Sequence, residues 1–219
     1  MTESEFIQII KEQYKDKSGV IGISGLSGSG KTTLAKKLRN YFPNRSLIVS
    51  FDDFCIAPTN LRKSFLQDAL DKKDFKKLQD LVDPIDKTQN PYANLLTWYD
   101  WRAIANTIED LKRGISVTRN NTWDQKTGEC NKVVTYEVPS NKPLLLYLDC
   151  IYMYEPVIAS HIDLTVMIDL AKDIANQREF DRDKHRNCDM YHEYKELVTQ
   201  KYCIPYLNHY KNQTDYFIN

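Results

Sequence analysis

A glycine-rich stretch near the start of the chain carries the clearest chemical signature of the sequence. Residues 25–32 read GLSGSGKT and match the phosphate-loop pattern G-x-x-x-x-G-K-[ST] at every position. Glycines in such a loop let successive backbone N–H groups point inward around phosphate oxygens. We expect Lys31 to reach the β- and γ-phosphates of a nucleotide and the Thr32 hydroxyl to bind Mg²⁺. The full set of predicted nucleotide contacts in this stretch is Gly25, Ser27, Gly28, Ser29, Gly30, Lys31, Thr32 and Thr33.

The segments on either side of this loop have the properties that a phosphate site needs. An apolar run of strand length, 20–24, precedes the loop, and the spacing of Leu34 and Leu38 predicts a helix after it. A helix that begins at Lys31 directs the positive end of its dipole at a bound phosphate. The alternative, a chance glycine-rich turn, does not account for this context.

A nucleotide site by itself does not define a function. The chain lacks the guanine-reading motif of GTPases, because the nearest stretch, NKPL at 141–144, has no aspartate, and it lacks the Ser-Gly-Gly signature of ABC ATPases. A chain of 219 residues leaves little room for the coupling elements of a motor. The class that remains is a compact kinase acting on a small molecule.

Asp52 is the first candidate for the group that orients or deprotonates the acceptor hydroxyl in such a kinase. It follows the apolar run 46–50, a predicted strand, and open α/β sheets bind ligands beyond the carboxyl ends of their strands. Asp53 is the alternative base, and aspartates at this place also commonly cap a turn. Our hypothesis assigns the base to Asp52, which is also placed to contribute to a metal site.

Asp149 is the second candidate for the metal site. It ends the apolar run 144–148 and offers a carboxylate that can hold Mg²⁺ beside Thr32. We interpret the next residue, Cys150, as a small buried packing residue.

Three arginines near the carboxyl end, Arg178, Arg182 and Arg186, are spaced so that a helix would place them on one face. Guanidinium groups can bind a phosphoryl group with paired hydrogen bonds. Acidic residues at 179, 181 and 183 alternate with the arginines, which is also typical of a solvated charged face. The residues alone leave both interpretations open.

The order of apolar and periodic stretches predicts an α/β fold. Strands and helices alternate at spacings that suit crossover connections, so we expect a mainly parallel sheet of about five strands with helices on both faces. The stretch 115–138 holds Thr127-Gly128 between two β-rich runs and predicts an inserted β-hairpin. The predicted strands lie at 20–24, 46–50, 143–149, 164–168 and 216–218, and the predicted helices at about 6–14, 31–41, 61–70, 101–113, 171–186 and 191–202.

Four motifs, in this order, resemble the superfamily of uridine kinases, phosphoribulokinases and nicotinamide riboside kinases. They are 21–38 around the phosphate loop, 49–54 (VSFDDF), 146–149 (LYLD) and 178–183 (REFDRD). The resemblance extends from about residue 18 to residue 210. It implies a P-loop NTPase fold in a single kinase domain, 1–219, with the catalytic aspartate at Asp52.

The same resemblance implies further roles. It places a mobile lid at 178–189, in which Arg182 and Arg178 clamp the transferring phosphoryl group and Arg186 contacts the nucleotide. The segment 119–136 resembles the hairpin that covers the nucleoside in uridine kinases. The chain differs from uridine kinases at Asp149-Cys150, where they carry Glu-Gly, and in a shorter lid. By position, the resemblance implies acceptor contacts from Asp53, Tyr99, Asp100, Trp123 and Asp124.

These features together predict ATP- and Mg²⁺-dependent phosphoryl transfer to a hydroxyl of a small nucleoside-like acceptor, most simply uridine or cytidine. Nicotinamide riboside, pantothenate and other small alcohols are alternatives within the superfamily. A polynucleotide kinase would need a basic track, whereas 30 basic side chains balance 30 acidic ones here. A non-catalytic nucleotide-binding protein would have no need of an acceptor base such as Asp52.

Composition limits the class of protein and its partners. With 42% hydrophobic and 27% charged residues, the chain has the usage of an ordinary globular domain, and its neutral net charge predicts no nucleic-acid partner. No apolar run approaches the ~20 residues of a membrane-spanning helix, so we expect no membrane partner. The five cysteines form no CxxC pair and the first residues lack a signal-peptide pattern, which predicts a reduced, cytoplasmic protein. A homo-oligomer is compatible with the sequence.

Overall fold

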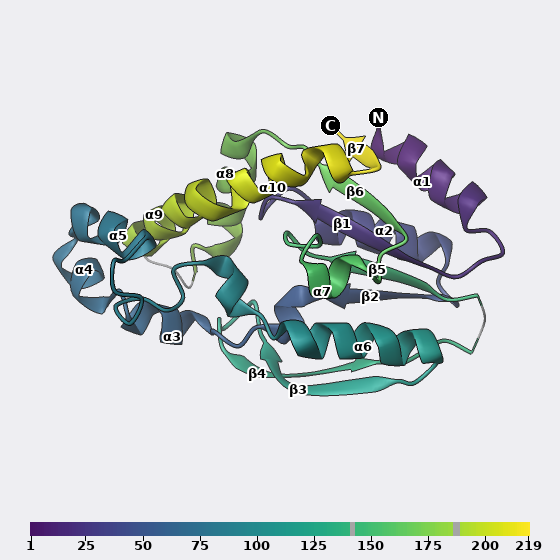
Figure 1. Cartoon of the computed structure of the whole chain (residues 1–219), viewed down its shortest axis with the longest axis horizontal. Coiled ribbons are helices and arrows are strands. Elements are labelled where there is room, and N and C mark those ends of the chain that lie inside the picture. Colours follow the sequence, from purple (N-terminus) through teal and green to yellow (C-terminus); the bar gives the residue numbers. More distant parts are fainter. Residues whose placement is uncertain (141–142, 186–188) are drawn as a thin grey trace.

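The computed structural model describes residues 1–140, 143–185 and 189–219 (Figure 1). It contains a sheet of five parallel strands in the order β2-β5-β1-β6-β7. The predicted α/β fold with a mainly parallel sheet is therefore confirmed. The strands are β1 (Gly19–Gly25), β2 (Ser46–Ser50), β5 (Leu145–Asp149), β6 (Leu164–Ile168) and β7 (Tyr216–Ile218).

Helices cover both faces of this sheet, which explains why its central strands β1 and β5 are buried along their whole length. Successive side chains of a strand point to opposite faces. Ile21 and Ile23 of β1 therefore pack in a buried cluster with α1 (Glu3–Gln13) and α2 (Lys31–Tyr41), whereas Val20 belongs to a second cluster. The helices that contribute to the second cluster include α6 (Trp101–Arg113), α7 (Pro156–Ala159), α8 (Lys172–Asp183), α9 (Asp189–Val198) and α10 (Ile204–Tyr210).

The local sequence explains where α6 begins and ends. The Asp100 carboxylate accepts a hydrogen bond from the Ala103 N–H at 2.9 Å and so caps the first turn. Gly114 follows the last turn with a φ of 86°, a left-handed conformation that glycine adopts without strain. Ile104 and Ile108 lie fully buried on one face of the helix. The predicted helix and its glycine stop are confirmed.

The predicted hairpin is present as a separate two-stranded antiparallel sheet of β3 (Val117–Trp123) and β4 (Cys130–Tyr136). Figure 1 shows it beside α6. Several contacts hold it against the segment after β2, and two of them are the following. The rings of Phe54 and Tyr136 stack with their centroids 6.4 Å apart, and the Thr59 N–H donates to a carbonyl of the hairpin turn at 2.8 Å. The hairpin is thus held close to the carboxyl end of β2.

The segment between β2 and α6 differs from the prediction. The helix predicted at 61–70 is divided into α3 (Thr59–Ser64) and α4 (Gln67–Lys72), because the Leu66 N–H bonds three residues back to Lys63 and so closes a tight turn. The helix α5 (Phe75–Val82) was not predicted. Across the described ranges, no helix combines the length and the apolar character needed to cross a membrane.

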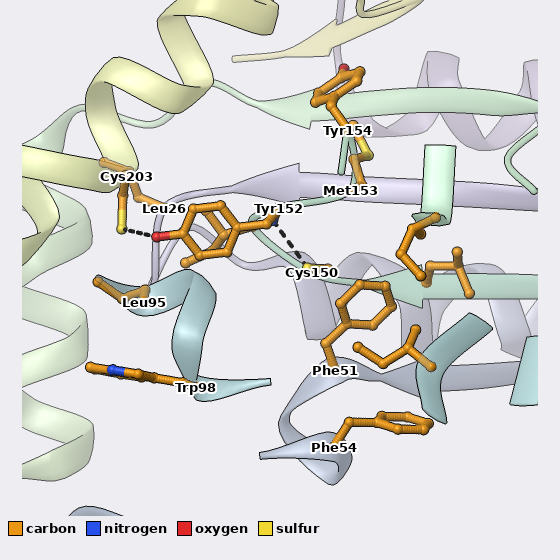
Figure 2. Packing of buried hydrophobic residues seen from close by; sticks show 14 of the residues in the cluster. Leu26, Phe51, Phe54, Leu95, Trp98, Cys150, Tyr152, Met153, Tyr154 and Cys203 are labelled. Atoms are coloured by element: carbon orange, nitrogen blue, oxygen red, sulfur yellow. Dashed lines mark hydrogen bonds between the residues drawn. The ribbon is translucent and has the colours of Figure 1, made fainter. Parts of the chain in front are cut away.

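Tyr152, shortly after β5, connects the sheet to the carboxyl-terminal helices (Figure 2). Its hydroxyl lies 3.1 Å from Sγ of Cys203, and its N–H donates to Sγ of Cys150 at 3.0 Å. Its ring meets the Tyr206 ring edge-on at 4.8 Å between centroids. Cys150 is buried in this packing, as its sequence position indicates.

Candidate active site

The phosphate loop connects the end of β1 to the start of α2 with a backbone that its glycines permit. Gly28 has a φ of +80° and Gly30 a φ of +106°, values that side chains disfavour. A β-carbon on Gly28 would lie 2.2 Å from the carbonyl oxygen of Ala175, so the loop and α8 are in close contact. A β-carbon on Gly30 would meet no atom within 4 Å, which leaves open space in front of α2.

Two polar side chains of the loop are suited to an anion. The Ser29 hydroxyl is buried and has no hydrogen-bond partner in the described part of the chain. The Lys31 ammonium donates to the Leu26 carbonyl oxygen at 3.0 Å and keeps further donors for a ligand. A buried hydroxyl without a partner is costly, and a phosphate oxygen would satisfy it. The residues of the loop therefore fit a phosphate group.

Thr32 and Asp149 form a pair of oxygen ligands next to the loop. The Thr32 hydroxyl, in the first turn of α2, donates a hydrogen bond to Oδ2 of Asp149 at the end of β5. They meet because β1 and β5 are neighbouring strands, with Ile23 opposite Asp149. Hydroxyl and carboxylate oxygens are ligands that Mg²⁺ accepts. These two residues therefore fit a magnesium site.

Asp52 lies in the 3₁₀ turn Phe51–Phe54, directly after β2, and opens onto the same cleft. Its side chain reaches solvent through that cleft. Desolvation by its surroundings, and next the charge of Asp149, nevertheless raise the pKa of Asp52, against the opposing effect of Arg182 and Lys31. A carboxylate with a raised pKa takes up a proton more readily, as a general base must.

The neighbouring Asp53 faces a different part of the structure. Its carboxylate accepts a hydrogen bond from the Tyr136 hydroxyl of β4 at 2.7 Å, and it does not line the cleft around the phosphate loop. Burial raises the pKa of Asp53, while the bond from Tyr136 opposes that rise. The two adjacent aspartates are therefore separated: one is open to the cleft, and the other is tied to the hairpin.

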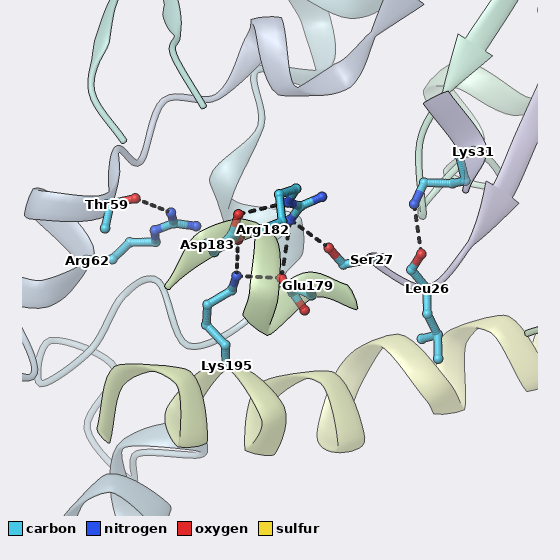
Figure 3. A network of polar contacts seen from close by, with 9 residues as sticks. All are labelled: Leu26, Ser27, Lys31, Thr59, Arg62, Glu179, Arg182, Asp183 and Lys195. Carbon is cyan, nitrogen blue, oxygen red and sulfur yellow. Dashed lines mark hydrogen bonds and ion pairs between the residues drawn. The ribbon is translucent and has the colours of Figure 1, made fainter. Parts of the chain in front are cut away.

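A network of four charged side chains fixes Arg182 beside the loop (Figure 3). The Arg182 guanidinium binds both oxygens of Asp183, at 2.8 and 3.0 Å, and its Nη2 lies 3.3 Å from the Ser27 hydroxyl. Lys195 of α9 donates to Asp183 at 3.1 Å and also to Glu179. Glu179 and Asp183 are 8% and 1% exposed as side chains, so they are not part of a solvated face.

Replacing Lys195 with methionine is expected to lower the free energy of unfolding by about 3 kcal/mol at pH 7, because it removes a cation that pairs with two buried carboxylates, Glu179 and Asp183. Burial opposes the ionisation of Glu179, but Lys195 and Arg182 outweigh it, so its pKa is lowered. A lowered folded-state pKa gives stability above the ordinary value of 4.5 that is lost as the pH falls through the folded value. The effect of the substitution should therefore shrink below pH 4.5. Urea unfolding across this range measures it.

The matched control is Lys172→Met, which removes a partly exposed ion pair with Glu196 at 3.2 Å. Such a pair contributes at most ~1 kcal/mol. A similarly small loss for Lys195→Met, or one that stays constant into the acid range, would contradict the role of the network.

One cleft brings together eight of the predicted site residues. They come from the phosphate loop, the ends of β2 and β5, the start of α6, the hairpin and α8, namely Ser27, Lys31, Thr32, Asp52, Tyr99, Trp123, Asp149 and Arg182. The walls around Tyr99 also include Leu95 and Trp98, so this part of the cleft is largely aromatic and apolar. Burial, and next the charge of Asp52, raise the pKa of Tyr99 well above its ordinary value, so that its phenol stays a hydrogen-bond donor.

Other predicted residues lie elsewhere in this structure. Asp100 caps α6, and Asp124 accepts a hydrogen bond from a backbone N–H in the hairpin turn. Thr33 and Arg178 are exposed and do not line the cleft. Arg186 lies outside the described residues. The functional contacts assigned to these five residues stay predictions.

Several side chains of the cleft had no signal in the sequence. Arg62 reaches it from α3, Lys195 from α9, and Trp98 from the segment before α6. None of them belongs to a motif, and only the tertiary fold brings them near the phosphate loop. Glu179 and Asp183 were visible as acidic neighbours of Arg182, but their burial could not be inferred from their spacing.

Comparisons with known proteins agree with this architecture. The model of the phosphoribulokinase / uridine kinase family matches residues 20–218. Human nicotinamide riboside kinase 1 is 40% identical over 70 residues, which are 30% of this chain and 35% of that protein, so the chain matches about a third of the relative's length.

Two solved structures have the same fold at low sequence identity. A possible uridine kinase from Bacillus stearothermophilus superposes with a TM-score of 0.57 at 14% identity, covering 99% of this chain and 97% of that one. The phosphoribulokinase from Rhodobacter spheroides gives a TM-score of 0.55 at 12% identity, covering 88% and 67%. With a P-loop kinase fold and a family match over nearly the whole length, the chain belongs to the phosphoribulokinase / uridine kinase family.

Proposed function

We propose that this protein transfers the γ-phosphoryl group of ATP to a hydroxyl group of a small, nucleoside-like alcohol. The observation that carries the proposal is the meeting of Lys31, Asp52 and Arg182 in one cleft, next to the Thr32–Asp149 pair. A protein that only binds nucleotides would not need a carboxylate of raised pKa open to the acceptor side of that cleft.

The residues of the cleft divide the chemistry among them. The loop backbone, Ser29 and Lys31 would bind the phosphates, and Thr32 with Asp149 would hold Mg²⁺. Mg²⁺, when bound, supplies charge neutralisation on the phosphate oxygens. Asp52 takes the proton of the acceptor hydroxyl as the hydroxyl oxygen bonds to the γ-phosphorus. At the same time the bond between the γ-phosphorus and the oxygen that leaves with ADP breaks.

The aromatic wall around Tyr99 supports a planar, nucleoside-like acceptor, with uridine or cytidine as the first compounds to assay. The local similarity to human nicotinamide riboside kinase 1 supports nicotinamide riboside as the second candidate. Pantothenate and other small alcohols are further members of the same acceptor class.

A second cavity is a suitable place for the adenine base of the donor, ATP. It borders the phosphate loop at Leu26, and its apolar walls come from β6, the residues after it and α10. Met167, Leu170, Ile204 and Leu207 line it. A flat heteroaromatic ring attached to phosphates in the loop would find apolar contacts there.

Replacing Asp52 with asparagine tests the proposed base. The substitution keeps the size of the side chain but removes its proton acceptor, so kcat should fall by ~10²-fold or more, while the Kd for ATP stays nearly unchanged. Steady-state kinetics with ADP as the readout, together with ATP titration, measures both quantities.

Asp53→Asn is the matched control, because Asp53 is bonded to Tyr136 and does not line the cleft. We expect it to reduce kcat much less than Asp52→Asn does. The reverse order of effects would transfer the role of base to Asp53, against this proposal.

A further inference from the structure

Arg62 of α3 is a buried cation in the part of the cleft around Tyr99 and Trp98, which we call the acceptor part. Its residue is 6% exposed, and it lines the same cleft as Asp52 and Tyr99. Its guanidinium lies 3.7 Å from the centre of the Trp98 ring, and its Nη2 donates to the Thr59 hydroxyl at 3.1 Å. Its Nε is buried and has no hydrogen-bond partner among the residues that the structure describes.

The other cations of the cleft have an ion-pair partner or belong to the phosphate loop, whereas Arg62 has neither role in the described structure. Arg182 and Lys195 pair with Asp183 and Glu179, and Lys31 belongs to the phosphate loop. Among residues 1–140, 143–185 and 189–219, no carboxylate forms an ion pair with Arg62; Figure 3 shows its contact to Thr59.

The position of Arg62 is costly unless a ligand completes it. Burying a charge without an opposite charge costs solvation free energy, and a cation–π contact with an aromatic ring offsets this cost only in part. The free Nε–H next to the guanidinium's terminal N–H groups is the edge that binds an oxyanion with two parallel hydrogen bonds. Such an edge recognises a carboxylate or a phosphate group.

The backbone places this edge on the side of the acceptor. The residue pair Cys55 and Tyr99 forms a β-bridge, so the turn that carries Asp52 and the segment that carries Trp98 are joined side by side. Arg62, Tyr99 and Asp52 all line the same cleft. A ligand that fills the space around Tyr99 can thus contact both the proposed base and the free guanidinium.

We infer that the acceptor is an anionic alcohol, whose carboxylate or phosphate group is bound by Arg62 while its hydroxyl faces Asp52. This inference rests on the proposed function, because it concerns the acceptor of the same reaction. It narrows that acceptor from nucleoside-like alcohols in general to those that carry an oxyanion.

Matched pairs of acceptors test the inference. Each pair differs mainly in an anionic group: uridine and orotidine, nicotinamide riboside and nicotinic acid riboside, glycerol and glycerate. Glycerol 3-phosphate, set beside glycerate, distinguishes a phosphate from a carboxylate. In the pair with the highest turnover, kcat/KM for the anionic member should exceed that of the neutral one by ~30-fold or more, the usual scale for a buried charge pair. Equal values, or a preference for the neutral member, would overturn the inference and leave the kinase assignment standing.

The Arg62→Met variant tests whether Arg62 causes the preference for the anionic acceptor. Methionine keeps apolar contact with Trp98 but has no charge, so kcat/KM for the anionic acceptor should fall by ~30-fold, while that for the neutral one changes by less than ~3-fold. Arg62→Lys should restore the preference only in part, because an ammonium lacks the planar pair of donors. A purely structural role predicts instead that both acceptors lose activity equally and that thermal unfolding without ligand occurs at a clearly lower temperature.

The matched control is Arg45→Met. Arg45 also stacks on an aromatic ring, that of Phe42, and its buried Nε likewise has no partner within the described ranges, but it does not line the cleft. Its loss should leave the preference for the anionic acceptor unchanged. Thermal-shift titration reports binding even if no acceptor in the panel is phosphorylated. Stabilisation of the wild-type protein, but not of Arg62→Met, by the anionic members supports the inference, and equal shifts in the two proteins contradict it.

Discussion

Replacing Arg182 with alanine is expected to lower kcat and kcat/KM for phosphoryl transfer together, by ~10³-fold, with a small change in the Kd for ATP. The structure holds this guanidinium 3.3 Å from the Ser27 hydroxyl of the phosphate loop by means of Asp183. We propose that from this position Arg182 contacts the γ-phosphoryl group as the charge of that group redistributes, so that it stabilises the transition state. Steady-state kinetics and ATP titration of the variant measure the two quantities separately.

Two further variants separate this role from general electrostatics. Arg182→Lys should recover little activity, because an ammonium cannot supply paired planar donors. Lys184→Ala removes an exposed cation two residues further on, which forms an exposed ion pair with Asp181 at 3.6 Å, and the substitution should be almost neutral. Full activity of Arg182→Ala at saturating ATP and acceptor would remove the support for a catalytic role of α8.

Replacing Lys31 with alanine should reduce phosphoryl transfer by at least ~10²–10³-fold, the scale for losing one preorganised electrostatic contact. The fold should survive, because the hydrogen bond that the ammonium donates goes to a backbone carbonyl of its own loop, that of Leu26, and the substitution leaves this carbonyl in place. ADP formation measures the activity, and thermal unfolding shows whether the variant is folded.

Lys36→Ala on the same helix is the control, since this lysine is exposed and does not line the cleft. Its activity should remain close to that of the wild-type protein. Turnover of Lys31→Ala within tenfold of the wild-type rate, in a folded protein, would be incompatible with the assigned phosphate site.

Local patterns in the sequence were sufficient to predict the sheet. The strands β2, β6 and β7 have the predicted bounds, because each is a short apolar run between polar or turn-forming residues. The glycine stop of α6 and the hairpin turn could also be predicted from single residues, because glycine favours such turns. Gly114 and Gly128 both adopt positive φ values there. The region 59–82 was predicted less well, because short helices separated by tight turns give a weak periodic signal.

The phosphate site could be predicted because each of its residues lies either in one sequence motif or at the end of an apolar strand. Lys31 and Thr32 lie in one motif, and Asp52 and Asp149 each follow an apolar strand, so sheet topology alone brings them together. The acceptor part could not be predicted in the same way. Arg62 reaches it from α3, a helix in the weakly predicted region, and no spacing in the sequence relates it to Asp52.

The most direct test of the account follows the phosphoryl group itself. The protein is incubated with Mg²⁺, ATP radiolabelled at the γ-phosphate, and each acceptor in turn, and the products are separated. We expect the label in a phosphorylated acceptor, in amounts equal to the ADP formed, and no ADP when the acceptor is omitted. Label released only as inorganic phosphate, at the same rate with and without acceptor, would contradict the account, because water and not an alcohol would then be the acceptor.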